Sequence, residues 1–289
     1  MMNKIKDLFG KGMTLSFEVF PPKEDQALEP VLNTLKKLYR FKPDFCSVTY
    51  GAGGSNRGRN LEICASIEEA GHTALAHLTC IGSGEAQLEE TLAQYQAAGV
   101  NNILSLRGDL PEGWADTQSG FAYACDLLRW IKQSPYGGRF CVGVTCNPET
   151  HVESKNLTTD LMHLRMKCDL GADFCVTQLF YDNESFYDYR ELMRKAGIRL
   201  PVVVGFMPVL SPKGVIRMTL KNGCAIPAGL ARIFAKYQDK PDEFRKAGIE
   251  YSIEQIAALI SNDIDGLHLY SLNRWESVSE ILDAVGMRR

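Results

Sequence analysis

The chain has 289 residues, of which 45% are hydrophobic and 23% are charged, as in an ordinary globular protein. Its 35 acidic and 32 basic residues give a formal net charge of −3, so the chain has no basic field to attract nucleic acid or an anionic membrane. Apolar runs such as "PVVVGFMPVL" are too short to cross a bilayer, which takes about 20 helical residues. The opening "MMNKIKDLFGKG" lacks the apolar core of a signal peptide, and we expect a cytoplasmic protein.

Short β-rich runs alternate with helix-like segments along the chain. The β-rich runs lie at 14–20, 45–51, 73–80, 102–109, 140–147, 174–180, 201–207 and 266–272. The helical segments lie at 25–40, 57–71, 85–99, 119–134, 154–171, 184–197, 212–222, 252–263 and 275–285, with extra helical material at 226–247. Several helical segments close on a glycine, such as Gly71 and Gly99, which is the residue favoured after the last helical turn.

This alternation predicts an α/β fold with a parallel sheet. Eight strand-helix units favour a closed (β/α)8 TIM barrel as a single domain over residues 1–289, with residues 1–12 as a lead-in and extra helix between strands seven and eight. Counting alone leaves an open sheet as the alternative. In a barrel, functional groups gather where the strands end, on the loops that lead into the helices.

The first run, "TLSFEVF", places one carboxylate among apolar residues. Alternation puts Glu18 and Ser16 on one face, opposite Leu15, Phe17 and Val19. The apolar face should meet the helices, so Glu18 should point into the barrel mouth, and the two prolines that follow end the strand just beyond it. A desolvated carboxylate has a raised pKa and acts as an acid near neutral pH. The alternative is a glutamate paired with an arginine of the barrel.

Other strand ends also carry polar residues. They are Thr49, His77, Asp109, Asn147 and Gln178, with Asn273 and Arg274 after the last strand. Seven of the eight runs thus deliver a polar group to one rim, which a structural protein has little reason to do. A lone strand histidine such as His77 is more often a core residue than a catalyst, and Asp109 is equally explained as the ion-pair partner of Arg107 two residues before it. The glycine-rich "TYGAGGSNRGR" lacks the spacing of a phosphate-binding loop, and a flexible loop is its default interpretation.

Two further patterns follow the fifth run. His151 and Glu153 form only one H-x-E pair, which is too short a pattern to predict a metal site. Asp160 and Lys167 share one face of the next predicted helix, and a solvated face is the simplest explanation.

Nine cysteines occur without any C-x-x-C pair. Cys46, Cys80, Cys141 and Cys175 lie within the apolar runs, where a thiol acts as a small hydrophobic group. We therefore expect reduced core thiols and no zinc site.

Taken together, these stretches resemble one family. "SFEVFPPK", "SVTYGAGG", "AHLTCIG", "LSLRGDLP", "VTQLFYD", "GFMPV" and "LHLYSLNR" are similar, in this order, to the signature stretches of methylenetetrahydrofolate reductase in its short bacterial catalytic form. The similarity runs from about residue 14 to residue 285. It implies a (β/α)8 barrel that carries FAD. NADH or NADPH reduces the flavin, which then reduces 5,10-methylenetetrahydrofolate to 5-methyltetrahydrofolate in a ping-pong exchange.

The resemblance also implies roles for matching residues. Glu18 matches the general acid that protonates the folate N10, and Asp109 matches the aspartate that binds folate and tunes the cationic intermediate. Gln178 and Arg274 match folate contacts, and Thr49 matches a nicotinamide contact. The positions implied to contact FAD are Tyr50, Ala52, His77, Arg107, Gly108, Asp109, Tyr123, Ala124, His151, Asp160 and Lys167.

Five positions depart from the family pattern. Asn147, His163 and Met166 stand where the family often has tyrosine, asparagine and arginine near the cofactor, which predicts a weaker hold on FAD. Gly214 and Met218 stand where bacterial members carry a glutamine and a stacking phenylalanine that order the nicotinamide. An electron-donating partner protein is therefore an alternative donor.

Two other functions remain open from the sequence. One is a pterin-binding barrel without redox activity, and the other is a non-catalytic subunit of a reductase complex. The family is often oligomeric, so a homo-oligomer is a further expectation, with a place in one-carbon metabolism and methionine biosynthesis.

Overall fold

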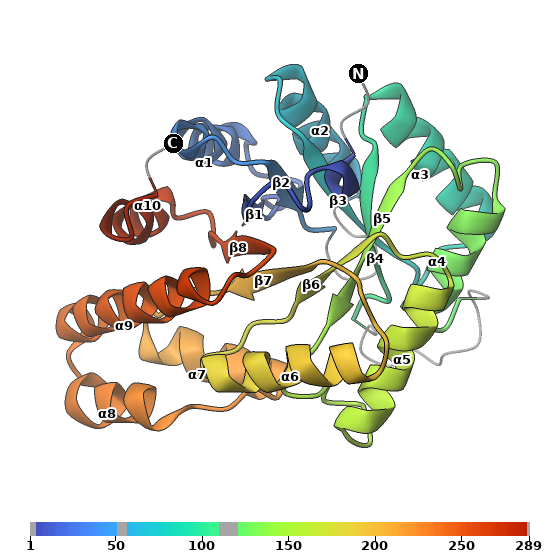
Figure 1. Ribbon diagram of the computed structural model, residues 1–289. Coiled ribbons are helices and arrows are strands. Elements are labelled where there is room, and N and C mark those ends of the chain that lie inside the picture. Colours follow the sequence, from blue (N-terminus) through green and yellow to red (C-terminus); the bar gives the residue numbers. More distant parts are fainter. Residues whose placement is uncertain (1–3, 51–56, 110–120, 288–289) are drawn as a thin grey trace.

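The computed structural model describes residues 4–50, 57–109 and 121–287 of the protein. Eight parallel strands form a closed barrel in chain order, and the last strand pairs with the first (Figure 1). The predicted (β/α)8 fold is confirmed, and the open-sheet alternative is wrong.

All eight predicted strands are present. They are β1 (Thr14–Val19), β2 (Phe45–Val48), β3 (Ala74–Thr79), β4 (Asn102–Leu106), β5 (Cys141–Cys146), β6 (Phe174–Thr177), β7 (Val202–Phe206) and β8 (Gly266–Tyr270). Each predicted run continued one to three residues beyond the end of its strand. As far as the structure describes them, those extra residues begin the loops at the barrel mouth, where the chain leaves the ladder of hydrogen bonds.

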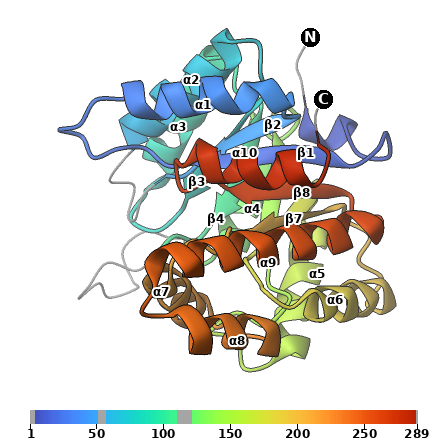
Figure 2. The ribbon, with the colours of Figure 1, turned by 90° about the vertical axis from the view of Figure 1, so that its left-hand side faces the viewer.

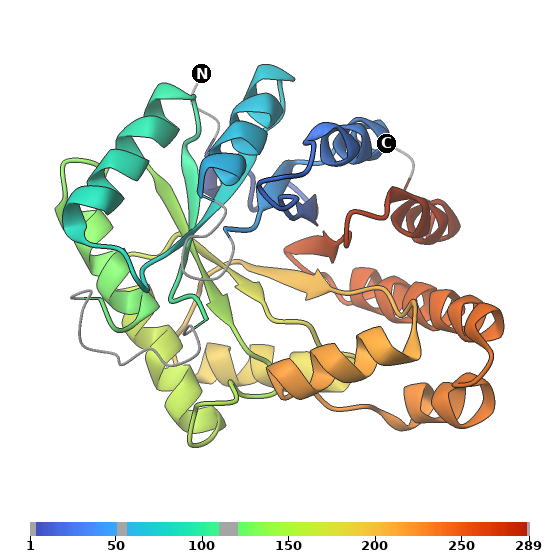
Figure 3. The same ribbon diagram turned by 180° about the vertical axis from the view of Figure 1, so that it is seen from behind.

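Helices surround the barrel, as the opposite views in Figures 1 and 3 show. They are α1 (Glu29–Leu38), α2 (Arg57–Glu69), α3 (Glu85–Ala97), α4 (Ala124–Gln133), α5 (Leu157–Asp169), α6 (Asn183–Lys195), α7 (Pro212–Asn222), α8 (Ala228–Tyr237), α9 (Pro241–Ser261) and α10 (Trp275–Ala284). Two short 3-10 helices, η1 (Ile5–Asp7) and η2 (Tyr39–Phe41), complete the described elements. No described helix is long and apolar enough to span a membrane.

The extra helical material between β7 and β8 differs from the prediction in its boundaries. Instead of helices at 226–247 and 252–263, the structure has the short α8 and the 21-residue α9, which pack against each other (Figure 2). Pro241 is the first residue of α9, where a backbone N–H has no acceptor within the helix, so proline loses no hydrogen bond there. Gly248 lies inside α9, where a Cβ would overlap the Val209 carbonyl oxygen. The glycine therefore permits close helix packing and does not mark a turn.

The apolar core has two main parts. The larger lies between the strands and the helices and includes Leu15, Phe17 and Val19. The second fills the barrel interior with side chains such as Phe45 and Phe174 and includes Ile5 of η1, whose N–H donates to the Asn102 side chain at 2.8 Å. Since the interior is packed there, a ligand must approach from the opposite end, where the strands deliver their polar residues.

The cysteines are free thiols, as expected. The four that were assigned to apolar strands are buried, and burial raises the pKa of Cys46 to about 12. Such thiols are protonated at neutral pH and pack as small hydrophobic groups.

Candidate active site

Glu18 lies inside the barrel near its mouth. The neighbouring residues Phe17 and Val19 belong to the apolar core between strands and helices, so alternation turns Glu18 inward. Its Oε2 is 3.6 Å from Nε2 of His77 and 3.9 Å from Nε2 of His268, and its side chain is 20% exposed. The predicted inward orientation is confirmed. A barrel arginine is not its partner, because the basic side chains beside its carboxylate among the described residues are these two histidines.

His77 is buried on β3 with one ring nitrogen unused. Its Nε2 has no hydrogen-bond partner among the described residues. Burial lowers the pKa of His77 to about 4, against the opposing effect of the Glu18 charge. The ring is therefore neutral at pH 7. His77 is thus buried, as the core-histidine interpretation expects, but its Nε2 lacks the hydrogen bond that buried polar atoms usually have.

His268 was not identified from the sequence. It lies on β8, where its Nδ1 is 2.7 Å from Oγ of Ser16 and its Nε2 is 3.1 Å from Oγ of Ser47. Its ring also stacks on Phe45, with centroids 5.9 Å apart. The two serines and the stacked ring fix the orientation of His268 beneath Glu18. Alternation along "LHLY" would have pointed to it, because His268 pairs in register with the inward-facing Ser16.

The exit of β1 is bound to the exit of β8. Ser271 donates its hydroxyl to the Glu18 carbonyl oxygen at 2.5 Å. The Asn273 side chain accepts from Phe20 N at 3.1 Å and donates to Phe20 O at 2.9 Å. Asn273, predicted only as a polar rim residue, therefore holds the backbone directly after Glu18. Arg274 follows as an exposed residue at the start of α10.

The end of β4 forms two ion pairs in different directions. Arg107 binds Glu153 through both guanidinium nitrogens, with Nη2 at 2.7 Å from Oε1, and this bond lowers the pKa of Glu153. Asp109 instead pairs with Lys221 of α7, with Nζ 3.0 Å from Oδ2. The alternative interpretation of Asp109 as the ion-pair partner of Arg107 is therefore wrong. Between them, Gly108 has a φ of 92°, and a Cβ there would lie 3.0 Å from Thr79 Cβ, so the close approach is to Thr79.

The loop between β5 and α5 is held by a buried carboxylate. Asp160 accepts from His151 N at 2.9 Å and from Ser154 Oγ at 3.3 Å. Lys167 reaches inward and donates to the Thr145 carbonyl oxygen at 2.6 Å, and burial lowers the pKa of Lys167. The solvated-face interpretation of Asp160 and Lys167 is therefore wrong. No cluster of three or more metal-ligating side chains occurs in the described parts of the chain.

The other predicted positions lie at strand or helix ends. Thr49 follows β2, and its carbonyl accepts from the Asn60 side chain at 3.1 Å, while Tyr50 is buried. Tyr123 is the exposed N-cap of α4, whose first residue is Ala124. Ala52 lies outside the described residues.

Gln178 follows β6 directly. Its Oε1 accepts from Leu179 N at 2.9 Å. The residue lines a small cavity together with Asn147 and with Asn222 of α7, so the ends of β5, β6 and α7 meet here. His163 and Met166 are exposed on α5.

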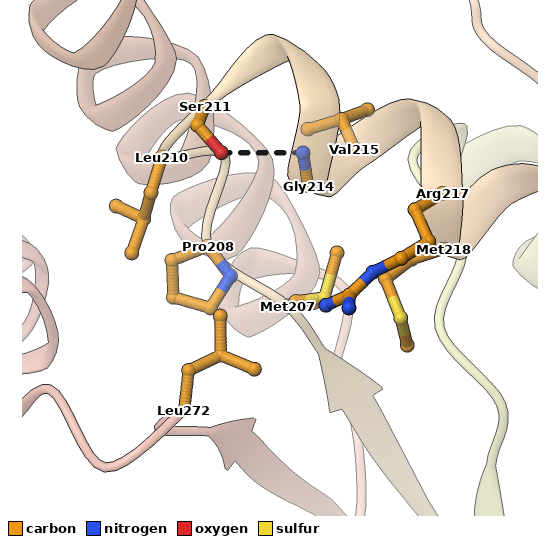
Figure 4. A pocket seen from close by; sticks show the side chains of 9 residues that line it. All are labelled: Met207, Pro208, Leu210, Ser211, Gly214, Val215, Arg217, Met218 and Leu272. Carbon is orange, nitrogen blue, oxygen red and sulfur yellow. Dashed lines mark hydrogen bonds between the residues drawn. The ribbon is translucent and has the colours of Figure 1, made fainter.

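An apolar pocket lies between β7, α7 and the exit of β8 (Figure 4). Its lining residues are Met207, Pro208, Leu210, Ser211, Gly214, Val215, Arg217, Met218 and Leu272. Gly214 and Met218, two of the departures from the family pattern, share this pocket. Arg217 supplies its only formal charge among these lining residues.

Comparison with known proteins identifies relatives across the chain. The family model described as methylenetetrahydrofolate reductase matches residues 2–286. Methylenetetrahydrofolate reductase (NADH) 1 of Arabidopsis thaliana is 35% identical over 99% of this chain, which spans about half (51%) of the plant protein. The 5,10-methylenetetrahydrofolate reductase of Escherichia coli is 32% identical, and the match covers 96% of this chain and 92% of the relative.

Solved structures share the barrel at low sequence identity. A Clostridium thermocellum protein described as binding two copies of 5-methyl-5,6,7,8-tetrahydrofolic acid has a TM-score of 0.67 at 13% identity, over 95% of this chain and 94% of that one. A tryptophan synthase chain of M. tuberculosis has a TM-score of 0.54 at 14% identity, over 96% and 94%. These likenesses concern the fold.

Proposed function

The chain belongs to the methylenetetrahydrofolate reductase family, and we propose that it reduces 5,10-methylenetetrahydrofolate to 5-methyltetrahydrofolate with FAD as the hydride carrier. The observation that carries the proposal is the position of Glu18, an inward carboxylate at the barrel mouth beside two histidines. A group in this position can deliver a proton to a substrate that enters the mouth. Support also comes from a bacterial relative matched over 92% of its length.

The proposed proton donor is Glu18. It gives its proton to the folate N10, which opens the five-membered ring of the substrate. Ser271 and Asn273 hold the backbone of this strand exit, and His268 lies beneath the carboxylate, so its position is fixed before substrate binds. Asp109, Gln178 and Arg274, on three different strand exits, bind the folate in this proposal.

The residues at the mouth suit a flavin dinucleotide. In this proposal Arg107, His151 and Lys167 bind its pyrophosphate, for which Arg107 exchanges its pair with Glu153 and Lys167 its bond to the Thr145 carbonyl oxygen. His77 belongs to the same proposed set. Thr49, Tyr50, Ala52, Gly108, Asp109, Tyr123, Ala124 and Asp160 complete the proposed FAD-binding set. When bound, FAD supplies the hydride that a protein side chain cannot.

NADH is the proposed electron donor. Three plant relatives at 33–35% identity carry NADH in their names. Here Gly214 and Met218 line a small apolar pocket beside α7, and in this proposal a ring of the donor packs against it. Anaerobic stopped-flow mixing with NADH tests this directly. We expect NADH to reduce the flavin rapidly. If NADH did not reduce the flavin and only a partner protein did, the partner protein would be the electron donor.

Purification and product analysis test the activity. The protein should be yellow, with a flavin band near ~450 nm, and should convert methylenetetrahydrofolate and NADH to 5-methyltetrahydrofolate. A colourless protein that takes up no FAD would contradict the flavoenzyme and favour the non-redox folate barrel. A yellow protein that forms no methyl product with any donor would contradict the reductase.

A further inference from the structure

The ion pair between Asp109 and Lys221 joins elements that are far apart in the chain. Lys221 is in the last turn of α7, 112 residues after Asp109, and its Nζ lies 3.0 Å from Asp109 Oδ2. Arg107 is engaged by Glu153, so within the described residues the cation paired with Asp109 comes from α7. Lys221 is not among the residues to which the resemblance assigns a role.

Two contacts hold the chain directly after α7 at the mouth, and one closes the helix itself. Ala225 N is 3.2 Å from both carboxylate oxygens of Glu149 in the loop after β5. A Cβ on Gly223 would lie 2.7 Å from Val152 Cγ1, so the chain passes close to the same loop. The Asn222 side chain closes the helix on the Met218 carbonyl oxygen at 2.9 Å. The backbone that carries Lys221 is therefore attached to the rim.

The opposite partner is also fixed. Gly108, directly before Asp109, has a positive φ and lies so close to Thr79 that an added Cβ would be 3.0 Å from its Cβ, so the chain that enters Asp109 passes against the end of β3. The contact with the ammonium group favours one direction for the exposed carboxylate. It also makes the pair neutral, so that a substrate meets a compensated carboxylate at the mouth.

We propose that Lys221 is a positioning residue of the reductase: it orients and neutralises Asp109 for folate binding. The inference rests on the proposed function, in which Asp109 contacts the folate. Lys221 itself does not touch the reacting atoms, and it acts through Asp109.

Kinetics of matched lysine variants test the proposal. Lys221→Met keeps the aliphatic stem and should raise KM for methylenetetrahydrofolate roughly two- to fivefold, the range of an exposed ion pair, with kcat little changed. Lys221→Arg should restore the wild-type KM. Lys213→Met, on an exposed lysine two turns earlier on α7, should leave KM unchanged. Added salt should raise KM of the wild type toward that of Lys221→Met, which loss of folding would not produce.

A double-mutant cycle separates action through Asp109 from a direct effect. In an Asp109→Asn background, Lys221→Met should cause no further change in KM. Equal KM values for Lys221→Met and Lys213→Met, a lower KM for Lys221→Met, or full additivity in the cycle would each overturn the proposal.

A measurement without turnover keeps this inference separate from the proposed activity. Acetylation by acetic anhydride, followed by mass spectrometry, should modify Lys221 more slowly in the wild type than in Asp109→Asn, with Lys213 unchanged. Equal rates at Lys221 would overturn the ion pair. If Lys221 is acetylated more slowly in the wild type but the wild type forms no methyl product, the proposed function is contradicted and the ion pair between Lys221 and Asp109 is still supported.

Discussion

At the scale of single residues, the candidate site depends on how neighbouring groups hold Glu18. His268 is fixed by two serines, and its Nε2 is 3.9 Å from the carboxylate. Asn273 binds the backbone of Phe20 twice. Leu272 and Asn273 adopt φ values of 52° and 54°, a left-handed conformation that asparagine tolerates and leucine rarely adopts. Strain of this kind persists where the surrounding contacts enforce it, and here it brings the Asn273 amide to β1.

Replacement of Asn273 tests this clamp. Asn273→Ala removes two hydrogen bonds and should lower the free energy of unfolding by about 1–3 kcal/mol, and it should lower kcat because the strand exit after Glu18 is no longer held. Asn273→Gly loses the same bonds but suits the positive φ, so it separates the side-chain effect from the backbone effect. If Asn273→Ala and the wild type had the same stability and kcat, the clamp would have no role.

His77 should make stability depend on pH. Its folded-state pKa is about 4 against an ordinary value of 6.5, mainly because of burial, with Glu18 and His268 acting in opposite directions. Between these values the unfolded chain binds more protons, so the contribution to stability is complete above pH 6.5 and is lost as pH falls toward 4.

The corresponding measurement compares urea unfolding of the wild type and His77→Gln. Between pH 6.5 and pH 5, the wild type should lose roughly 2 kcal/mol more than the variant, because a tenfold difference in proton affinity between the unfolded and folded chain corresponds to about 1.4 kcal/mol. Parallel stability curves for the two proteins would show that His77 is not a buried neutral histidine.

Residue types and alternation were enough to predict Glu18 facing inward, since its strand has a single apolar face. The ion-pair partners were not predictable. Arg107 pairs with Glu153, and Asp109 pairs with Lys221, although Arg107 and Asp109 are only two residues apart. The folded loops bring residues that are distant in the sequence into contact, while residues that are close in the sequence point apart. Sequence spacing alone does not give this loop geometry.

At the scale of elements, the strands were predictable because each is a short apolar run bounded by turn residues. The boundary of α9 was not, because the "AG" at residues 247–248 has the composition of a turn. Only the packed structure shows that Gly248 lies against the Val209 carbonyl.

Substitution by alanine is expected to change the stability in opposite directions at two helical glycines. Gly248→Ala should lower the free energy of unfolding by about 1–3 kcal/mol, since its Cβ would overlap backbone that cannot move freely. Gly58→Ala in α2 has no heavy atom within 4 Å of the added Cβ and should raise stability by up to about 1 kcal/mol. Thermal and urea unfolding measure both. Equal effects would contradict the close packing of α9.

At the scale of the whole molecule, closure of the barrel gives distant residues a common location. Glu18, His77 and His268 lie on β1, β3 and β8, and the last is 250 residues from the first in the chain. The barrel interior is packed at one end, and the polar strand exits lie at the other. A ligand can therefore approach these groups from one direction. The fold was predictable from eight repeated units, whereas the support of Glu18 by β8 required the closed structure.

The most direct measurement follows the two half-reactions of Glu18→Gln separately by anaerobic stopped-flow absorbance near ~450 nm. Reduction of the flavin should proceed at nearly the wild-type rate, because that step needs no proton from Glu18. Reoxidation of the reduced protein by methylenetetrahydrofolate should slow by about 10²–10⁴-fold, the usual effect of losing a general acid. Equal slowing of both half-reactions, or unchanged reoxidation, would contradict Glu18 as the acid at the barrel mouth.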